Sequence, residues 1–142
     1  MVKDATCSIC NKTFSGYGNN PAPFTGEICC DECDNHYVIP LRLYALVRDP
    51  SYALHFKEDG TMESLKPKNK YFTLKELQQA VGGLIELYPY RYMNMLIVCD
   101  EEGLLKEKRV NTIFEGLTSI KLVGDIVLCP ETIFEEPDEE DS

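Results

Sequence analysis

The sequence predicts an α+β protein in which a small cysteine-rich module precedes a larger, mostly antiparallel domain. This prediction rests on three observations. Five of the seven cysteines lie in the first quarter of the chain, hairpin-like segments follow from residue 51, and a well-marked helix start lies among those segments. We expect residues 1–48 to form the module, 51–130 the α+β domain and 131–142 an acidic, disordered tail.

The composition is typical of a folded protein in a reducing compartment. An apolar fraction of 44% with 10% aromatic residues excludes wholesale disorder. No apolar run approaches the roughly 18 to 20 residues that span a bilayer, and the first residues show no apolar stretch of signal-peptide type. We therefore expect a cytoplasmic protein with no membrane partner, whose cysteines are thiols or metal ligands rather than disulfides.

The formal charge of −10 is concentrated at the C-terminus. Residues 131–142 hold seven acids and no base, which leaves −3 on the rest of the chain. This composition, with Pro137 in its middle, indicates a solvated tail that buries nothing. The alternative is a phosphate mimic directed at a basic partner.

The strongest motif is a pair of CxxC sequences separated by nineteen residues, formed by Cys7, Cys10, Cys30 and Cys33. Each CxxC turn places two sulfurs on one side of a tight knuckle, and two knuckles complete a tetrahedron around a metal ion. Four thiolates leave no open coordination position. The spacing therefore predicts a closed, structural Zn²⁺ site.

Three further residues bear on this site. Cys29 is an alternative to Cys30 as ligand, although its CxxxC spacing to Cys33 makes a poorer knuckle, and His36 is a reserve ligand. Cys99 and Cys129 lie in apolar, strand-like runs, where we expect each to be a small buried hydrophobic residue.

The segment between the knuckles is rich in Gly, Asn and Pro, which indicates turns. We expect Phe14, Tyr17 and Phe24 to be the packing residues of a small two-stranded finger. Helical spacing follows from Asp31 to Val47, where Pro40 either kinks the helix or begins a new one. This order of knuckle, finger, knuckle and helix resembles a treble-clef zinc module, for which the metal would supply much of the folding energy.

The second half begins with a predicted hairpin. Residues 52–56 alternate as in a half-buried strand, which places His55 on the polar face, and Asp59-Gly60 is a strong turn signal before the return strand. A helix should begin after Thr73, with Glu76 completing a capping box, and end at Gly82-Gly83. Its core-facing residues should be Leu74, Leu77 and Val81.

The remaining elements alternate between short strands and turns. Strands are expected at 84–88 and 93–99, followed by a turn at 100–103. Asn111 should cap a short helix that carries Ile113, Phe114 and Leu117. Residues 120–123 and 126–129 flank Gly124-Asp125 as in a hairpin, which completes a mostly antiparallel α+β domain.

Several of these segments resemble a domain family of phages and mobile elements. The resemblance lies in Val81-Gly82-Gly83-Leu84-Ile85-Glu86, Asp100-Glu101-Glu102-Gly103, Asn111-Thr112 and Gly124-Asp125. The N-terminal stretch, with its Cys-Cys-Asp-Glu-Cys, similarly resembles zinc modules of small phage proteins. The resemblance implies a phage or mobile-element origin, and the family has no established reaction to carry over.

No arrangement of residues predicts catalysis. His36 and His55 lie in no nucleophile motif, and the P-loop, the GxGxxG fingerprint and the zinc-deaminase signature are absent from the sequence. The acids Asp100, Glu101 and Glu102 suit a turn better than a cation site. We therefore expect a non-enzymatic protein that acts by binding.

Three kinds of partner compete. A host protein is our first expectation, with interference with host defence as its purpose. Nucleic acid and a small anionic ligand, such as a nucleotide signal, are the alternatives, because Lys and Arg contact phosphates and aromatic rings stack on bases. The candidate residues for these two partners are Lys66, Lys68, Lys70, Tyr90, Arg91 and Arg109. The near-neutral body and the −2 charge of a four-thiolate zinc site weaken attraction for phosphate.

Overall fold

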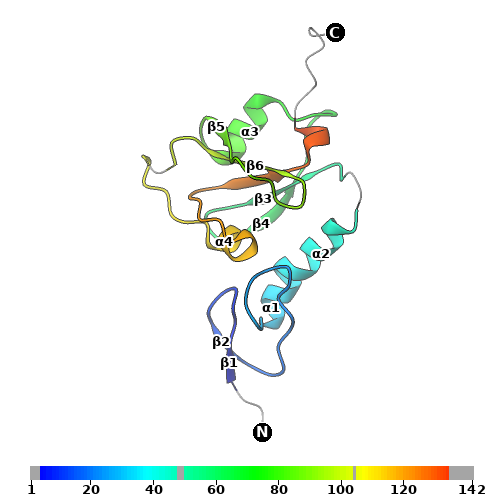
Figure 1. Cartoon of the computed structure of the whole chain (residues 1–142), viewed down its shortest axis with the longest axis vertical. Coiled ribbons are helices and arrows are strands. Elements are labelled where there is room, and N and C mark those ends of the chain that lie inside the picture. The colour runs from blue at the N-terminus through cyan, green and yellow to red at the C-terminus, as the bar shows by residue number, and fades with distance from the viewer. Residues whose placement is uncertain (1–3, 48–49, 104, 135–142) are drawn as a thin grey trace. The chain divides into compact units, whose positions relative to one another are not determined.

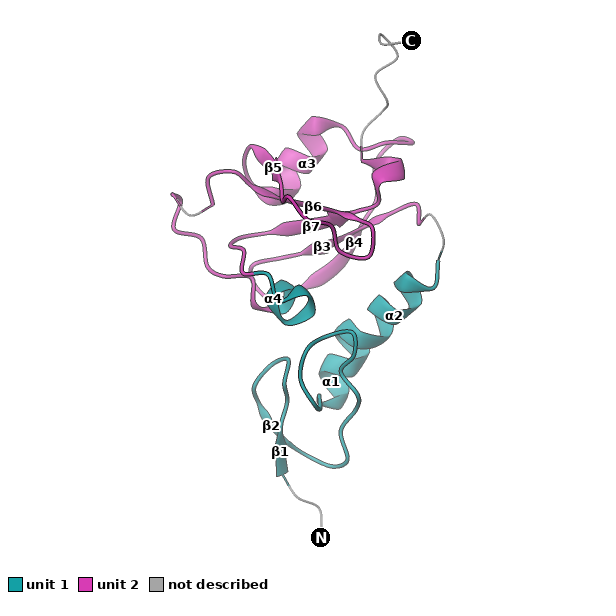
Figure 2. Cartoon of the chain, in the orientation of Figure 1, with its two compact units in different colours: residues 1–48, 113–120 teal, residues 49–112, 121–142 magenta. Residues whose placement is uncertain are grey.

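The computed structural model describes three stretches of the chain, residues 4–47, 50–103 and 105–134. The chain divides into two compact units, shown in different colours in Figure 2. The first comprises Met1–Arg48 with Ile113–Ile120, and the second comprises Asp49–Thr112 with Lys121–Ser142. Within each unit the neighbouring strands are antiparallel, so the predicted α+β class is confirmed.

The first unit begins with a short hairpin of strands β1 (Asp4–Thr6) and β2 (Thr13–Ser15), paired with Ala5 opposite Phe14 (Figure 1). The hairpin encloses the first CxxC knuckle instead of lying between the two knuckles. Phe24 is buried as predicted, but Tyr17 is 98% exposed. The prediction that Tyr17 packs in the module is therefore wrong.

A continuous helical segment follows the second knuckle. It consists of α1 (Asp31–Cys33), the π-helical η1 (Asp34–Val38) and α2 (Ile39–Ala45). Pro40 lies in the first turn of α2 and has no N–H to donate, and Ile39 N–H donates to the carbonyl of Asp34, five residues back. As predicted, a new α-helix begins with Pro40 in its first turn. The π-helical turn η1 joins this helix to α1, so the helical segment is not interrupted.

Helix α4 (Thr112–Thr118) contributes most of its residues to this first unit. The Gly116 carbonyl accepts hydrogen bonds from Thr25, through its N–H at 2.7 Å and its Oγ1 at 2.9 Å. These contacts join residues that are far apart in sequence. Residues 113–120, which sequence analysis placed in the α+β domain, therefore group with the N-terminal residues.

The second unit is built on a five-stranded antiparallel sheet with strand order β4-β3-β7-β6-β5. Its strands are β3 (Ala53–Phe56), β4 (Met62–Leu65), β5 (Ile85–Leu87), β6 (Leu96–Asp100) and β7 (Ile126–Cys129). The predicted hairpin of 120–123 with 126–129 is wrong. Strand β7 pairs with β3 and β6, while Val123 forms an isolated bridge with Val110.

Helix α3 (Leu74–Val81) has both predicted ends. Thr73 Oγ1 accepts from Glu76 N–H at 3.1 Å, and Glu76 Oε1 accepts from Thr73 N–H at 3.0 Å, which completes the capping box. Gly82 ends the helix in the left-handed conformation, with φ of 81°. Leu77 and Val81 are buried, but Leu74 is 52% exposed and does not face the core as predicted.

The core of the second unit lies between α3 and one face of the sheet. Its buried members are Ala53, Phe72, Leu77, Val81, Val98, Val127, Cys129 and Ile133. Strand β3 is buried at all four positions and not at alternate ones. It lies between β4 and β7, and helix α3 covers the face that carries Ala53 and His55. His55 is consequently buried, with Nε2 2.9 Å from the Ala80 carbonyl and 3.2 Å from Asp125 Oδ2, which corrects its predicted polar-face position.

The start of the disordered tail, predicted at residue 131, is too early in the sequence. Glu131–Ile133 form the short 3₁₀ helix η2, in which Ile133 is buried and accepts a hydrogen bond from Phe72 N–H at 3.0 Å. Apolar residues at the start of the tail explain this correction. The rest of the predicted tail, from residue 135, lies outside the described residues. In the part of the chain that is described, no helix combines the length and apolar character needed to cross a bilayer.

Candidate metal centre

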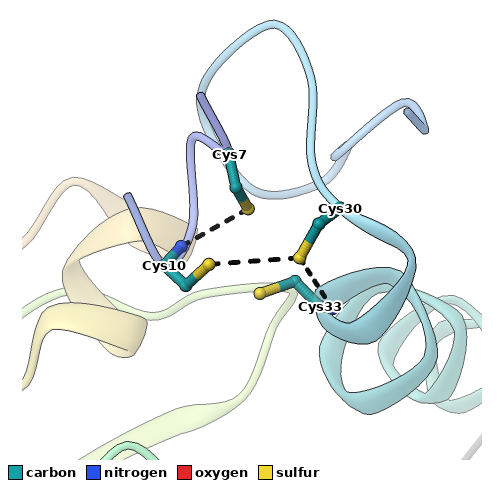
Figure 3. Close-up of side chains that lie close together, drawn as sticks. All are labelled: Cys7, Cys10, Cys30 and Cys33. Atoms are coloured by element: carbon teal, nitrogen blue, oxygen red, sulfur yellow. Dashed lines mark hydrogen bonds between the residues drawn. The ribbon is translucent and has the colours of Figure 1, made fainter. Parts of the chain in front are cut away.

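Four cysteine sulfurs converge in the first unit (Figure 3). The Sγ atoms of Cys7, Cys10, Cys30 and Cys33 all lie within 4.8 Å of one another, and the Cys10 and Cys30 sulfurs are 4.0 Å apart. A tetrahedron with metal–sulfur bonds of about 2.3 Å has edges of about 3.8 Å. The four thiols are therefore spaced to hold a metal ion.

The first knuckle is shaped by the turn of the β1–β2 hairpin. Cys7 N–H donates to the Lys12 carbonyl and Asn11 N–H donates to the Cys7 carbonyl, both at 2.9 Å. The amides of Ile9 and Cys10 lie 3.4 and 3.5 Å from Cys7 Sγ. Burial alone would raise the pKa of Cys7, but the backbone amides of Cys10, Cys30 and Ile9 outweigh it and lower the pKa to about 6. The knuckle therefore favours a thiolate at Cys7.

The second knuckle lies at the beginning of α1. Cys30 is the N-cap residue, and its sulfur accepts from Cys33 N–H at 3.5 Å. Burial, together with the neighbouring sulfurs, raises the pKa of Cys33, and burial also raises that of Cys10. A cation offsets both effects, because it stabilises the ionised form of each ligand. The donor set thus fits a thiophilic metal ion.

The structure also separates Cys29 and His36 from the cluster. The backbone N–H and carbonyl of Cys29 form a reciprocal pair with Asn19, with both bonds at 2.9 Å. The group of converging ligands contains Cys30, and burial raises the pKa of Cys29 to about 11. His36 is an exposed residue of η1 outside this group. Successive residues of an extended chain point in opposite directions, which explains why only one of the adjacent cysteines can join.

The two remaining cysteines lie in the sheet of the second unit. Cys99 and Cys129 are buried, as predicted, in β6 and β7. Burial raises the pKa of Cys99 to about 11 and that of Cys129 to about 12. Both thiols therefore stay protonated at neutral pH, which suits a packing role.

The predicted anion-binding residues lie in the second unit and are mostly engaged in local contacts. Arg91 makes two bonds to the Glu131 carboxylate, at 2.8 and 3.3 Å, and Arg109 donates to Glu58 Oε1 through its N–H at 2.9 Å and its Nε at 3.1 Å. Both guanidinium groups are thus paired with acids.

The lysines and the tyrosine of the predicted set are exposed. Lys66, Lys68 and Lys70 lie in the loop between β4 and α3, where Lys70 Nζ lies 5.4 Å from the centre of the Tyr71 ring. Tyr90 is 69% exposed and its ring is 5.8 Å from that of Tyr88. Among the described residues, no hydrogen bond, ion pair or ring contact joins these lysines and Tyr90 to the paired arginines in one site.

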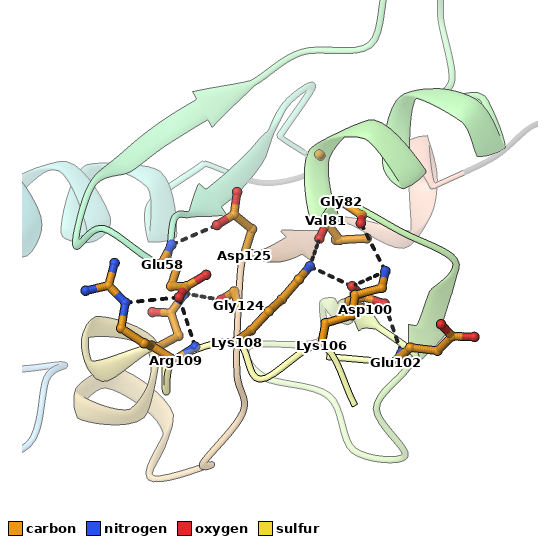
Figure 4. Close-up of polar contacts among 12 residues, drawn as sticks. Glu58, Val81, Gly82, Asp100, Glu102, Lys106, Lys108, Arg109, Gly124 and Asp125 are labelled. Atoms are coloured by element: carbon orange, nitrogen blue, oxygen red, sulfur yellow. Dashed lines mark hydrogen bonds and ion pairs between the residues drawn. The ribbon is translucent and has the colours of Figure 1, made fainter. Parts of the chain in front are cut away.

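The second unit contains a buried ion cluster that the sequence patterns did not predict (Figure 4). The side chain of Asp100, at the end of β6, is fully buried and its Oδ2 lies 2.6 Å from Lys108 Nζ and 3.0 Å from Lys106 Nζ. Its Oδ1 accepts from Glu102 N–H at 2.9 Å, which is the turn contact expected from sequence. Burial acts to raise the pKa of Asp100, but the two lysines and the amide outweigh it and lower the pKa to about 2.

The same lysines close the end of helix α3. Lys108 Nζ donates to the Val81 carbonyl at 2.9 Å and Lys106 Nζ to the Gly82 carbonyl at 3.2 Å. These carbonyls lie at the negative end of the helix dipole, where cations are favoured. A buried acid directly after an apolar strand, with lysines six and eight residues later, is the sequence signal that could have revealed this cluster.

The fold and the four-thiol cluster define an α+β protein with a candidate metal centre in a small N-terminal unit. The chain belongs to a family described as a domain of unknown function (DUF3846), whose model matches residues 51–139. The match includes the Asp100 cluster and lies entirely after the four converging cysteines. No curated protein and no solved structure matches the chain.

Proposed function

We propose that the protein is a non-enzymatic, zinc-binding accessory protein of a phage or mobile element that acts by binding a host factor. The observation that supports this proposal is the convergence of four cysteine sulfurs within 4.8 Å of one another. Tetrahedral sites with four sulfur ligands are typical of zinc or of iron–sulfur centres. Two CxxC knuckles at this spacing are typical of zinc.

The ligand set supports a structural metal. Four protein sulfurs fill the tetrahedral coordination of zinc, so no position is open for water or substrate. The strands of the first unit are only three residues long, and its buried side chains include the metal-site residues Cys7 and Cys33 themselves. Metal binding would therefore supply folding energy to a unit with a small core, and that unit would present a rigid binding surface.

A protein partner is favoured over nucleic acid by the charges. The chain has a formal charge of −10, and the zinc-loaded thiolate cluster adds −2 relative to the neutral thiols. Arg91 and Arg109, the arginines that could hold phosphate, are paired with Glu131 and Glu58. The motif resemblance to phage and mobile-element proteins supports a host target, and interference with host defence is the purpose that we propose for this binding.

Affinity purification of the tagged full chain from expressing bacterial cells tests the proposal. We expect a defined host protein to be retained with the zinc-loaded chain, both with and without nuclease treatment. A Cys33→Ser variant should lose zinc and retain less of that protein, whereas Cys99→Ser should retain both. Recovery of nucleic acid alone, or of a partner that nuclease removes, would contradict the proposal.

A further inference from the structure

A groove of about 470 Å³ opens beside the four-thiol cluster. One wall is β2 and the residues after it, including Phe14 and Tyr17, and the other is the start of the helical segment, including Glu32 and His36. Three of the four converging cysteines also line it. A single ion needs far less space, because even a water molecule occupies only about 30 Å³. The groove therefore offers room for a ligand in addition to the metal.

The groove is lined by more negative than positive charge. Its ionised side chains are Asp31 and Glu32 against Lys12, and a divalent metal with four thiolates adds −2. Asp31 accepts a hydrogen bond from Asn19 Nδ2 at 2.8 Å. The Glu32 carboxylate is exposed and makes no hydrogen bond or ion pair with another described residue. Glu32 is thus placed to receive a cation from outside the chain.

Tyr17 adds an aromatic surface to the same groove. Its side chain is 98% exposed, although it lies next to the tightly packed Gly18. A Cβ at Gly18, where φ is 71°, would collide with the side chain of Ile28 and lie 2.9 Å from Phe14 Cζ. Close packing at Gly18 therefore fixes the chain at this point, and the adjoining Tyr17 ring projects into solvent. An exposed ring that lines the same groove as two acidic side chains favours a cationic ligand, since ring faces attract ammonium and guanidinium groups.

We propose that this groove binds a basic peptide segment of a partner protein, with an Arg or Lys side chain paired to Glu32 and stacked on Tyr17. The inference rests on the proposed function and assigns its binding surface and the chemistry of the partner. Excess negative charge in the groove disfavours a phosphate-bearing ligand, and an extended peptide can follow the length of an open groove between a strand and a helix.

The test measures fluorescence anisotropy of a labelled GRGKGRG peptide with the zinc-loaded full chain, and uses a GEGDGEG peptide as the charge-reversed probe. Glu32→Lys should weaken binding about tenfold, and Glu32→Gln and Tyr17→Ala about threefold to fivefold each. The matched controls are Glu101→Lys, Glu101→Gln and Tyr90→Ala, at exposed positions of the second unit. Each control changes charge or aromatic content equally and should change affinity less than about twofold.

Zinc content and circular dichroism of every variant establish that the metal site and fold are intact. Equal weakening by Glu32→Lys and Glu101→Lys would overturn the inference, since it would show attraction to overall charge, including that of the acidic C-terminal residues. Tighter binding of the acidic probe would also overturn it. Equal capture of a host protein by the wild type and the Glu32→Lys variant would support the proposed function and refute the groove as its binding surface. Failure to capture any host protein would refute the proposed function without affecting the peptide measurement.

Discussion

Lys108 Nζ lies 2.6 Å from Asp100 Oδ2 and donates in addition to the Val81 carbonyl at 2.9 Å. One ammonium group thus joins the end of strand β6 to the last turn of helix α3. The same group thus provides a hydrogen-bond donor to a fully buried carboxylate and to a carbonyl at the end of the helix. The pairing is a structural feature of the matched family region, because all three residues lie within it.

The first prediction concerns the charge of Asp100. Asp100→Asn should lower the free energy of unfolding at pH 7 by about 2 kcal/mol, because the folded-state pKa is lowered from 3.8 to about 2. Since the folded pKa lies below the unfolded one, this stability is present above about pH 4 and is lost as the pH falls towards 2. Urea denaturation of both proteins across this pH range checks the prediction.

The informative quantity is the difference in unfolding free energy between the wild type and the Asp100→Asn variant. Acid also protonates the cysteine ligands, which weakens metal binding equally in both proteins. The gap in unfolding free energy should therefore narrow as the pH falls, whatever happens to the metal. A gap that stays constant from pH 7 to pH 3, or that widens with acid, would contradict the role assigned to the Asp100 carboxylate.

The second prediction concerns two glycines with different surroundings. A Cβ at Gly83 would lie 2.8 Å from Asp100 Oδ1 and would also collide with Lys106 Nζ, so Gly83→Ala should destabilise the protein by about 1 to 3 kcal/mol. Gly116, in α4, has only Phe24 Cδ2 nearby at 3.9 Å. Gly116→Ala should therefore be neutral or stabilise by up to about 1 kcal/mol. Thermal and urea unfolding of both variants check the contrast, and equal effects would refute it.

Local patterns predicted the ends of helix α3 and the class of the fold, because a capping box and a helix-ending glycine act within a few residues. Burial was less predictable. His55 lies at an alternate position of β3 that looks polar in the sequence. It is nevertheless enclosed by Ala80, in helix α3, and by Asp125, the residue directly before β7. Such contacts depend on strand order, which alternation in one strand does not encode.

The third prediction distinguishes the two adjacent cysteines. Purified wild-type protein should contain about one zinc per chain, and Cys30→Ala should lose most of it because a thiolate ligand is removed. Cys29→Ala should keep the metal, since Cys29 lies outside the converging group and its backbone pairs with Asn19. Mass spectrometry of metal content in both variants checks this. Loss of zinc from Cys29→Ala with retention in Cys30→Ala would reverse the assignment.

The candidate metal centre was more accessible from sequence than the Asp100 cluster. Each CxxC knuckle is a local turn, so spacing alone identifies residues that converge in space. The lysines that surround Asp100 follow it by six and eight residues, and the carbonyl that completes the cluster belongs to Val81. No short motif links these residues. The exposure of Tyr17 could not be predicted from a short motif either, because it depends on how Gly18 packs against Ile28.

The fourth prediction concerns the start of the acidic C-terminus. Truncation after Pro130 should lower the free energy of unfolding by about 2 to 5 kcal/mol relative to truncation after Phe134, because it removes the buried Ile133 and the partly buried Phe134. It also removes the Arg91–Glu131 ion pair, whose contribution to stability is small because both side chains are exposed to solvent. Denaturant titration of the two truncated chains checks this, and equal stabilities would show that residues 131–134 contribute nothing.

The last prediction concerns nucleic acid. Binding of the zinc-loaded chain to fluorescein-labelled single-stranded DNA and RNA 20-mers should be weaker than about 10 μM at physiological salt, because phosphate binding needs unpaired cations. The chain carries a formal charge of −10, and Arg91 and Arg109 are held by Glu131 and Glu58. Lys68→Glu and Tyr90→Ala should therefore leave any residual binding almost unchanged. Submicromolar, salt-sensitive binding to unrelated oligonucleotides that either variant weakens would favour nucleic acid over a basic protein as the partner.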